Sequence, residues 1–101
     1  MRMFVHNVLF TLKDADKDAL TASLIADVMT YLKVIPTVRC IAAGKPTPRT
    51  RPVIDSAYDV GLCVIFDDKA AHDVYQDHAS HVLFKNRQAA NWTKIRVIDF
   101  E

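Results

Sequence analysis

The chain has 101 residues, of which half are apolar and a quarter are charged, and its formal net charge is +1. This length accommodates one domain, residues 1–101, and the composition is that of a folded globular protein rather than a disordered one. The near-neutral charge gives no indication of a nucleic-acid partner or of binding to an anionic membrane.

The beginning of the chain, MRMFVHNVLF, has neither a long apolar run nor a small-residue cleavage site, so no signal peptide is expected. No stretch reaches 18 consecutive apolar residues, so no membrane-spanning helix is expected either. Cys40 and Cys63 lie in apolar, strand-like segments without metal-ligand spacing, which is typical of free thiols in a reducing compartment. These features predict a cytoplasmic protein.

The first half of the chain is predicted to form a strand, a helix and a second strand. Residues 4–12, FVHNVLFTL, are rich in β-branched, aromatic and apolar side chains, and the even positions are the more apolar ones. Apolar residues then recur at helical spacing over 16–35, and Pro36 ends this amphipathic helix. Residues 38–43, VRCIAA, are predicted to be a short strand, after which Gly44 opens a polar loop.

The second half is predicted to add a strand, two helices and a last strand. Residues 58–66, YDVGLCVIF, form a strand that is apolar on both faces. A helix that starts at two aspartates covers 67–78, and a further helical stretch covers about 81–91. The last strand is predicted at 95–100, IRVIDF.

This order of elements predicts a ferredoxin-like α+β sandwich (βαββαβ), with a four-stranded antiparallel sheet and all helices on one face. Apolar side chains nevertheless occur on the other face too, at Val5, Leu9, Cys63, Ile65, Ile98 and Phe100. An exposed apolar surface of that size usually marks an interface. We therefore predict a homodimer in which the two sheets face each other, giving a dimeric α/β barrel.

Four segments resemble the stress-responsive A/B barrel domain (Dabb) family, a group of dimeric α/β barrels. They are HNVLFTLK, IPTV, YQDHASHVLF and VIDFE, and they are spread in order over nearly the whole chain. The family pattern has a histidine in the first strand, here His6. Near the end of the second helix it has a tyrosine and a histidine–proline–any–histidine motif, here Tyr75, His78 and His81, with Ala79 in place of the proline. The resemblance implies a ferredoxin-like subunit and a dimer.

The resemblance leaves two kinds of function open. Many members have no known reaction, which implies a homodimeric small-molecule-binding domain with an apolar pocket between sheet and helices. A similar plant member is a polyketide cyclase, in which the tyrosine and the last histidine of the motif carry the chemistry; these match Tyr75 and His81. Its first-strand histidine, matching His6, lines the pocket. Val28 and Val60 stand where that cyclase carries tyrosine and histidine.

His81 and Tyr75 are accordingly the candidate catalytic residues. An aldol closure needs a base for the proton next to a carbonyl and a donor for the enolate, and histidine and tyrosine suit these two tasks. On a regular helix the six-residue spacing leaves the two side chains about 120° apart, so a break near Ala79 is needed to bring them together. Alternatively, His81 holds the junction between two helices and Tyr75 lies at the edge of the core.

The enzyme alternative is a cofactor-independent cyclase or lyase, or a cofactor-free monooxygenase, and no cofactor is expected. The only glycines are Gly44 and Gly61, so there is no glycine-rich phosphate loop, and neither cysteine lies in an activating setting. A small apolar or aromatic ligand is expected instead. The residues predicted to line its pocket are His6, Val8, Phe10, Leu24, Val28, Leu62, Phe84 and Trp92, although core packing alone would also explain His6 and Trp92.

Two weaker candidates are a metal pair and a basic loop. His78 and His81 are three residues apart and could share an ion, but a catalytic zinc site normally has three protein ligands, so no metal site is expected there. Lys45, Arg49 and Arg51 could bind an anion or nucleic acid. The third strand lacks the stacking aromatic residues of an RNA-binding sheet, so a solvated loop is the expectation.

Overall fold

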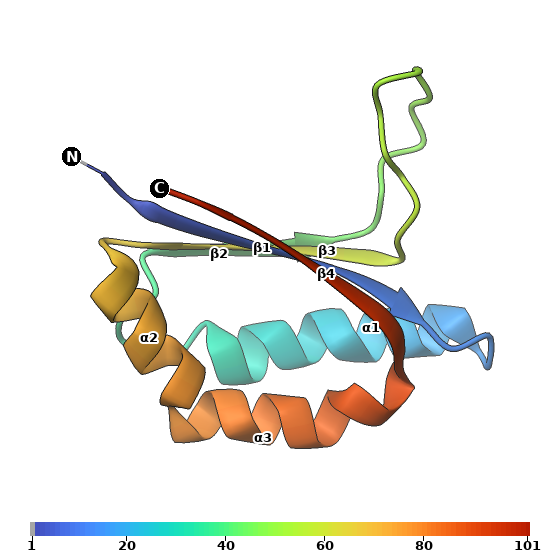
Figure 1. Cartoon of the computed structure of the whole chain (residues 1–101). Helices are drawn as coiled ribbons and strands as arrows, with labels where there is room; N and C mark the ends of the chain where they lie inside the picture. Colours follow the sequence, from blue (N-terminus) through green and yellow to red (C-terminus); the bar gives the residue numbers. More distant parts are fainter. Residues whose placement is uncertain (1) are drawn as a thin grey trace.

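The computed structural model describes residues 2–101, which form a four-stranded antiparallel sheet with helices against one face (Figure 1). The elements in chain order are β1 (Phe4–Leu12), α1 (Lys17–Asp27), β2 (Cys40–Gly44), β3 (Val60–Phe66), α2 (Lys69–Asp77), α3 (Ala79–Gln88) and β4 (Trp92–Phe100). A π-helical turn, η1 (Val28–Leu32), continues α1, and a 3-10 turn, η2 (Ala89–Asn91), follows α3. The predicted ferredoxin-like α+β fold is confirmed.

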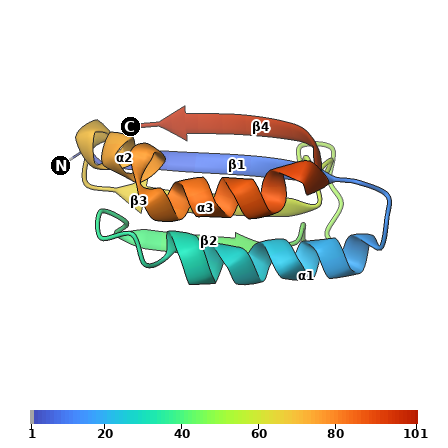
Figure 2. The same ribbon diagram turned by 90° about the horizontal axis from the view of Figure 1, so that it is seen from below.

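The strand order in the sheet is β2-β3-β1-β4, so β1 and β3 are central and β2 and β4 are the edges. Viewed from the helical side, α2 crosses one end of β1 and α3 runs alongside the middle of the sheet, while β4 extends beyond the helices (Figure 2). β1 pairs with β4 so that His6 faces Asp99 and Phe10 faces Ile95. β4 therefore forms an edge of the sheet with one side free of a neighbouring strand.

The core lies between the sheet and the helices, and its strand residues alternate strictly. The even residues of β1 and of β3 are buried while the odd ones are partly exposed, as expected for strands with one face against helices. The buried apolar residues are Phe4, Val8, Phe10, Leu12, Leu24, Val28, Leu32, Ile35, Val60, Leu62, Val64, Phe66, Tyr75 and Phe84. Most of this core was predictable from the two periodicities of the sequence.

Some element boundaries differ from the prediction. β4 begins at Trp92 rather than at residue 95, because Leu12 pairs with Trp92 across a register shift between Thr11 and Leu12. The polar residues Thr93 and Lys94 hide this start of the strand from a pattern of apolar residues. The last helix begins at Ala79, two residues earlier than expected, and the first helix is α-helical only to Asp27 before the turn η1.

A polar cluster holds α1 against α3. The Asp27 carboxylate is buried and accepts hydrogen bonds from Arg87 Nε at 2.9 Å and from Gln88 Nε2 at 2.7 Å. Gln88 also donates to Ser23 Oγ at 3.1 Å, and the Arg87 guanidinium lies 5.0 Å from the centre of the Tyr31 ring. The arginine beside it lowers the pKa of Asp27, so the carboxylate stays charged and paired.

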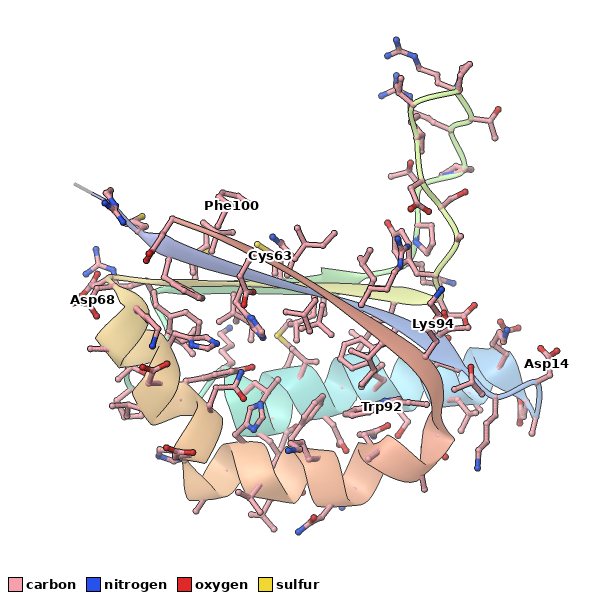
Figure 3. The ribbon with its side chains drawn as sticks, viewed as in Figure 1. Asp14, Cys63, Asp68, Trp92, Lys94 and Phe100 are labelled. Carbon is pink, nitrogen blue, oxygen red and sulfur yellow. The ribbon has the colours of Figure 1, made fainter. Side chains whose placement is uncertain are left out.

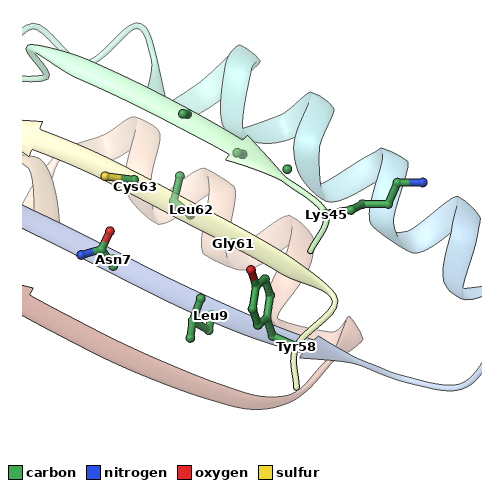
Figure 4. A pocket seen from close by; sticks show the side chains of 10 residues that line it. Asn7, Leu9, Lys45, Tyr58, Gly61, Leu62 and Cys63 are labelled. Atoms are coloured by element: carbon green, nitrogen blue, oxygen red, sulfur yellow. The ribbon is translucent and has the colours of Figure 1, made fainter. Parts of the chain in front are cut away.

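The face of the sheet opposite the helices is apolar and carries no helix of residues 2–101. Phe100 and Cys63 project from this outer face, whereas Trp92 lies on the helical side (Figure 3). Close to β2 the outer face is hollowed by about 380 Å³, with Asn7, Leu9 and Tyr58 among the lining residues (Figure 4). The loop between β2 and β3 rises on this same side (Figure 1). Within residues 2–101, no helix is both long and apolar enough to cross a membrane.

Candidate functional site

The chain breaks between α2 and α3 at His78, whose backbone is extended (φ −65°, ψ 140°). The imidazole of His78 begins α3 by accepting the Ser80 amide hydrogen at its Nδ1, at 3.0 Å. The Ser80 hydroxyl donates to the Tyr31 carbonyl, which fixes the start of α3 to the end of η1. His78 is therefore a helix-capping residue.

This break brings Tyr75 and His81 together. Their ring centroids are 4.8 Å apart with an interplanar angle of 65°, an edge-to-face contact across the junction of the two helices. Both side chains are buried, and Phe66 packs against the other side of the tyrosine at 4.9 Å. The pair could not have met on one continuous helix. The predicted break is present, one residue before Ala79.

Tyr75 and His81 form part of the wall of a cavity between the sheet, α2 and α3. The cavity has a volume of about 240 Å³. Its mouth lies along β4, where Ile95 and Val97 face the cavity but remain exposed. The lining residues are His6, Val8, Phe10, Leu62, Tyr75, Gln76, His81, Phe84, Lys85, Trp92, Ile95 and Val97.

Six of the eight residues predicted to contact a ligand line this cavity: His6, Val8, Phe10, Leu62, Phe84 and Trp92. Leu24 and Val28 do not; both are fully buried in the core under α1. Their helical periodicity marks the core face equally well, so the sequence could not separate core from cavity there. The prediction missed Gln76, Lys85, Ile95 and Val97. Of these, only Ile95 and Val97 had a signal, since they alternate along the last strand.

Burial sets the protonation of the two candidate catalytic groups. The pKa of His81 is lowered to about 4, first by burial and then by the positive potential of Lys85, His6 and His72. At neutral pH the imidazole is therefore uncharged and able to accept a proton. Burial raises the pKa of Tyr75, so its hydroxyl stays protonated and can donate a hydrogen bond.

Two ring nitrogens in the cavity wall are buried without a hydrogen-bonding partner among residues 2–101. They are Nδ1 of His81 and Nε1 of Trp92. A buried polar atom without a partner typically costs about 1–3 kcal/mol, so folded proteins rarely retain one without a reason. A bound ligand with an oxygen acceptor would satisfy the Trp92 N–H.

A further polar side chain of the wall is His6, which is held by Asp99 of β4. His6 Nδ1 lies 2.6 Å from Asp99 Oδ1. Because a carboxylate can only accept, Nδ1 carries the hydrogen and the lone pair is left on Nε2. Burial nevertheless lowers the pKa of His6, and Asp99 only partly opposes this effect. The ring of His72, a residue of α2, lies 4.9 Å from the ring of His6.

Almost the whole chain matches the model of one protein family. The model of the stress responsive A/B barrel domain (Dabb) matches residues 4–101. The chain belongs to this family. The resemblance drawn from the four sequence segments is thereby confirmed.

Several solved structures have the same fold, and one of them is described as a Dabb family protein. A Dabb protein with a ferredoxin-like fold from Mesorhizobium loti is 31% identical, with a TM-score of 0.80 over 98% of this chain and 95% of that one. A dimeric ferredoxin-like protein of unknown function from Thermobifida fusca is 19% identical, with a TM-score of 0.79 over 97% and 89%. A hydroxynitrile lyase from Passiflora edulis is 18% identical, with a TM-score of 0.79 over 98% and 92%. Comparison with curated proteins gives no match.

Proposed function

We propose that this Dabb protein is a homodimeric small-molecule-binding domain whose ligand occupies the cavity between the sheet and the helices. The observation that carries the proposal is the wall of that cavity. It combines apolar side chains with two buried nitrogens, His81 Nδ1 and Trp92 Nε1, that lack protein partners. A mostly apolar wall with a few convergent polar groups is the usual composition of a ligand site.

The cavity also limits the class of ligand. Its volume of about 240 Å³ is below the range of sites for drug-sized molecules, roughly 300–1,000 Å³, so the ligand is compact. Aromatic side chains line it at Phe10, Tyr75, Phe84 and Trp92, which favours a flat, apolar body. Lys85 adds a positive charge and Trp92 an N–H donor, which favours an acid or a ketone oxygen at the polar end. A single-ring aromatic acid or a short β-keto acid meets these conditions.

The dimer in this proposal forms through the outer face of the sheet. Its apolar side chains, among them Ile98 and Phe100, are exposed in the single chain. A contiguous apolar face of this kind is typical of an interface rather than of a monomer surface. The protein from Thermobifida fusca, which has this fold, is a dimer.

A second candidate function is cofactor-independent catalysis, favoured by the contact between Tyr75 and His81. The neutral imidazole of His81 would remove a proton from a carbon next to a carbonyl, and the Tyr75 hydroxyl would donate a hydrogen bond to the enolate oxygen that forms. The enolate carbon would then attack a second carbonyl group of the same substrate molecule, forming the new carbon–carbon bond. The resulting alkoxide would take a proton from the imidazolium, which restores the neutral base.

A thermal-shift screen tests the binding proposal, using benzoic acids, short β-keto acids and fatty acids. A ligand at a hundred times its dissociation constant adds about 2.7 kcal/mol to the stability of the folded state, which raises Tm by many degrees in a domain of this size. We expect a shift with a single-ring acid or keto acid that is lost in His81→Ala. His78→Asn, which keeps a capping side chain outside the cavity, should shift like the parent.

Two results would speak against the proposal. One is the absence of any shift, and the other is an equal shift in the parent and in His81→Ala. For any acid that does bind, its conversion, followed by mass spectrometry, separates the two candidate functions. Turnover that Tyr75→Phe slows without loss of binding would favour the enzyme, whereas binding without turnover leaves the binding domain.

A further inference from the structure

A second group of polar side chains lies at the end of the sheet covered by α2. The register of β1 and β4 places Asp99 directly opposite His6, and both side chains face the helices. Seen from the helical side, α2 crosses this end of β1 (Figure 2), and the ring of its residue His72 lies 4.9 Å from that of His6. Three elements that are far apart in the sequence thus contribute one side chain each.

The three side chains present a metal-ligand set. One ligand atom from each of His6, His72 and Asp99 can be chosen so that all three lie within 4.8 Å of one another. Two imidazoles and one carboxylate are the donors that zinc and other first-row transition metals prefer, whereas Mg²⁺ and Ca²⁺ prefer oxygen. Ligand bonds of about 2.0–2.2 Å require the three atoms to approach somewhat further. Rotation of the Asp99 side chain, the most exposed of the three, would supply most of that movement.

The surroundings of His72 resemble those of a metal-ligating histidine. Its Nδ1 lies 3.2 Å from Asp73 Oδ1, so the carboxylate accepts the N–H and leaves the lone pair on Nε2. Metal-binding histidines usually donate their second ring N–H to a carboxylate in this way, which fixes the ring and its tautomer. The Gln76 amide nitrogen lies 3.1 Å from Nε2 and would leave it when an ion binds.

The ring of His72 is also held in place by its packing. It stacks on Phe4 at 4.5 Å and contacts Phe66 edge-to-face at 5.4 Å. A ring held this way loses little further freedom when it binds an ion. An ion can reach the group from solvent, because the side chain of Asp99 is 34% exposed and that of His72 is 12% exposed. The group is therefore preorganised and reachable from solvent.

We propose that His6, His72 and Asp99 bind one divalent transition-metal ion, with Zn²⁺ as the reference ion. Three protein ligands leave at least one coordination position for water or for an oxygen of a bound molecule. Since His6 also lines the cavity, the ion adjoins the ligand site and adds positive charge beside it. The proposal does not depend on the ligand proposed above, because its three donors include neither His81 nor Trp92, whose unpaired nitrogens support that ligand.

Calorimetric titration of the untagged, EDTA-treated protein with ZnCl₂ tests this proposal. We expect one ion per chain. Asp99→Asn keeps the shape and the partial exposure of the side chain but weakens its donor, so it should reduce zinc affinity at least about tenfold. His72→Gln should reduce it at least as much. His78→Asn is the matched control: it removes a histidine outside the group, keeps a capping side chain, and should bind zinc like the parent.

Titration with Co²⁺ supplies a second readout that needs no activity. Ligation by two imidazoles and a carboxylate should give visible absorption bands in the parent and in His78→Asn, and these should be lost in Asp99→Asn. The proposal is overturned if the parent does not bind zinc stoichiometrically, or if His78→Asn weakens zinc binding as much as Asp99→Asn does. Binding of zinc without any shift by acids would sustain this inference and contradict the ligand proposal; the converse result would do the opposite.

Discussion

The rings of His81 and Tyr75 are in edge-to-face contact at 4.8 Å although six residues separate them in the chain. The contact exists because His78 leaves the helical conformation and then caps the next helix with its own side chain. The extended backbone of one residue thus separates two helices, and the two side chains become neighbours in one cavity wall. The result is a neutral imidazole beside a protonated phenol in a largely apolar site.

The orphaned nitrogen of His81 has a consequence for stability. His81→Leu replaces the imidazole with an apolar side chain and removes the unpaired Nδ1. We expect the free energy of unfolding to rise by about 1 kcal/mol, because the cost of burying an unsatisfied polar atom disappears. Urea unfolding at pH 7 measures the change. His78→Leu should have the opposite effect and lower the free energy of unfolding by about 1 kcal/mol, because it removes a helix cap. A loss of stability in His81→Leu would contradict a net cost of the unpaired Nδ1.

The lowered pKa of His81 makes stability depend on pH. Its pKa is about 4 in the folded state against about 6.5 in the unfolded chain, so the unfolded chain binds more protons between these two values. The contribution of the neutral imidazole is therefore fully present above pH 6.5 and is lost as pH falls towards 4. We expect the free energy of unfolding to drop by on the order of 2 kcal/mol from this group over that range.

Urea unfolding at several pH values between 4 and 7, in EDTA, measures this slope. His81→Leu should flatten it, because the titrating group is gone while Lys85, His6, His72 and Asp77 remain nearby. A slope that is the same in the variant would assign the pH dependence to other groups. It would also remove the support for a neutral His81 as a base.

The sequence predicted the fold because its signals were local. The alternation of apolar residues in β1 and β3 and the helical spacing from Leu20 to Leu32 each define one buried face, and the order of elements leaves few ways to join those faces. The site was predictable only in part. The family pattern pointed to Tyr75, His81 and His6. The six-residue spacing alone would have placed Tyr75 and His81 on different sides of one regular helix.

The sequence did not predict the contacts that depend on how strands pair and how a helix crosses the sheet. Asp99 is an ordinary acidic residue in the last strand until the register of β1 and β4 places it against His6. His72 lies on the second helix, and no motif or spacing in the sequence relates it to His6. Its position over His6 follows from the way α2 crosses the sheet, which no periodicity encodes. Leu24 and Val28 do not line the cavity, and the sequence could not show this because core and cavity residues share one apolar face.

The polar cluster between α1 and α3 should contribute strongly to stability. Asp27→Ala removes one of the two acceptors of the buried Gln88 amide and leaves Arg87 without its carboxylate partner. We expect a loss of about 2 kcal/mol in the free energy of unfolding, measured in urea at pH 7. Asp55→Ala is the control, because Asp55 forms an exposed ion pair with Arg96, and it should change stability little. Similar effects of the two variants would mean that the Asp27 cluster contributes no more than a surface pair.

The outer sheet face should hold the proposed dimer together, and Ile98 is the residue with which to test it. Ile98 faces away from the helices and is 51% exposed in the single chain, while Val82 on α3 is 47% exposed and lies away from that face. In the dimer, Ile98→Asp would bury an unpaired carboxylate between two apolar sheets, so this variant should be monomeric. Val82→Asp adds the same charge at a comparable exposure and should remain a dimer. Size-exclusion chromatography with light scattering gives the masses. A dimeric Ile98→Asp protein, or a monomeric parent, would contradict assembly through this face.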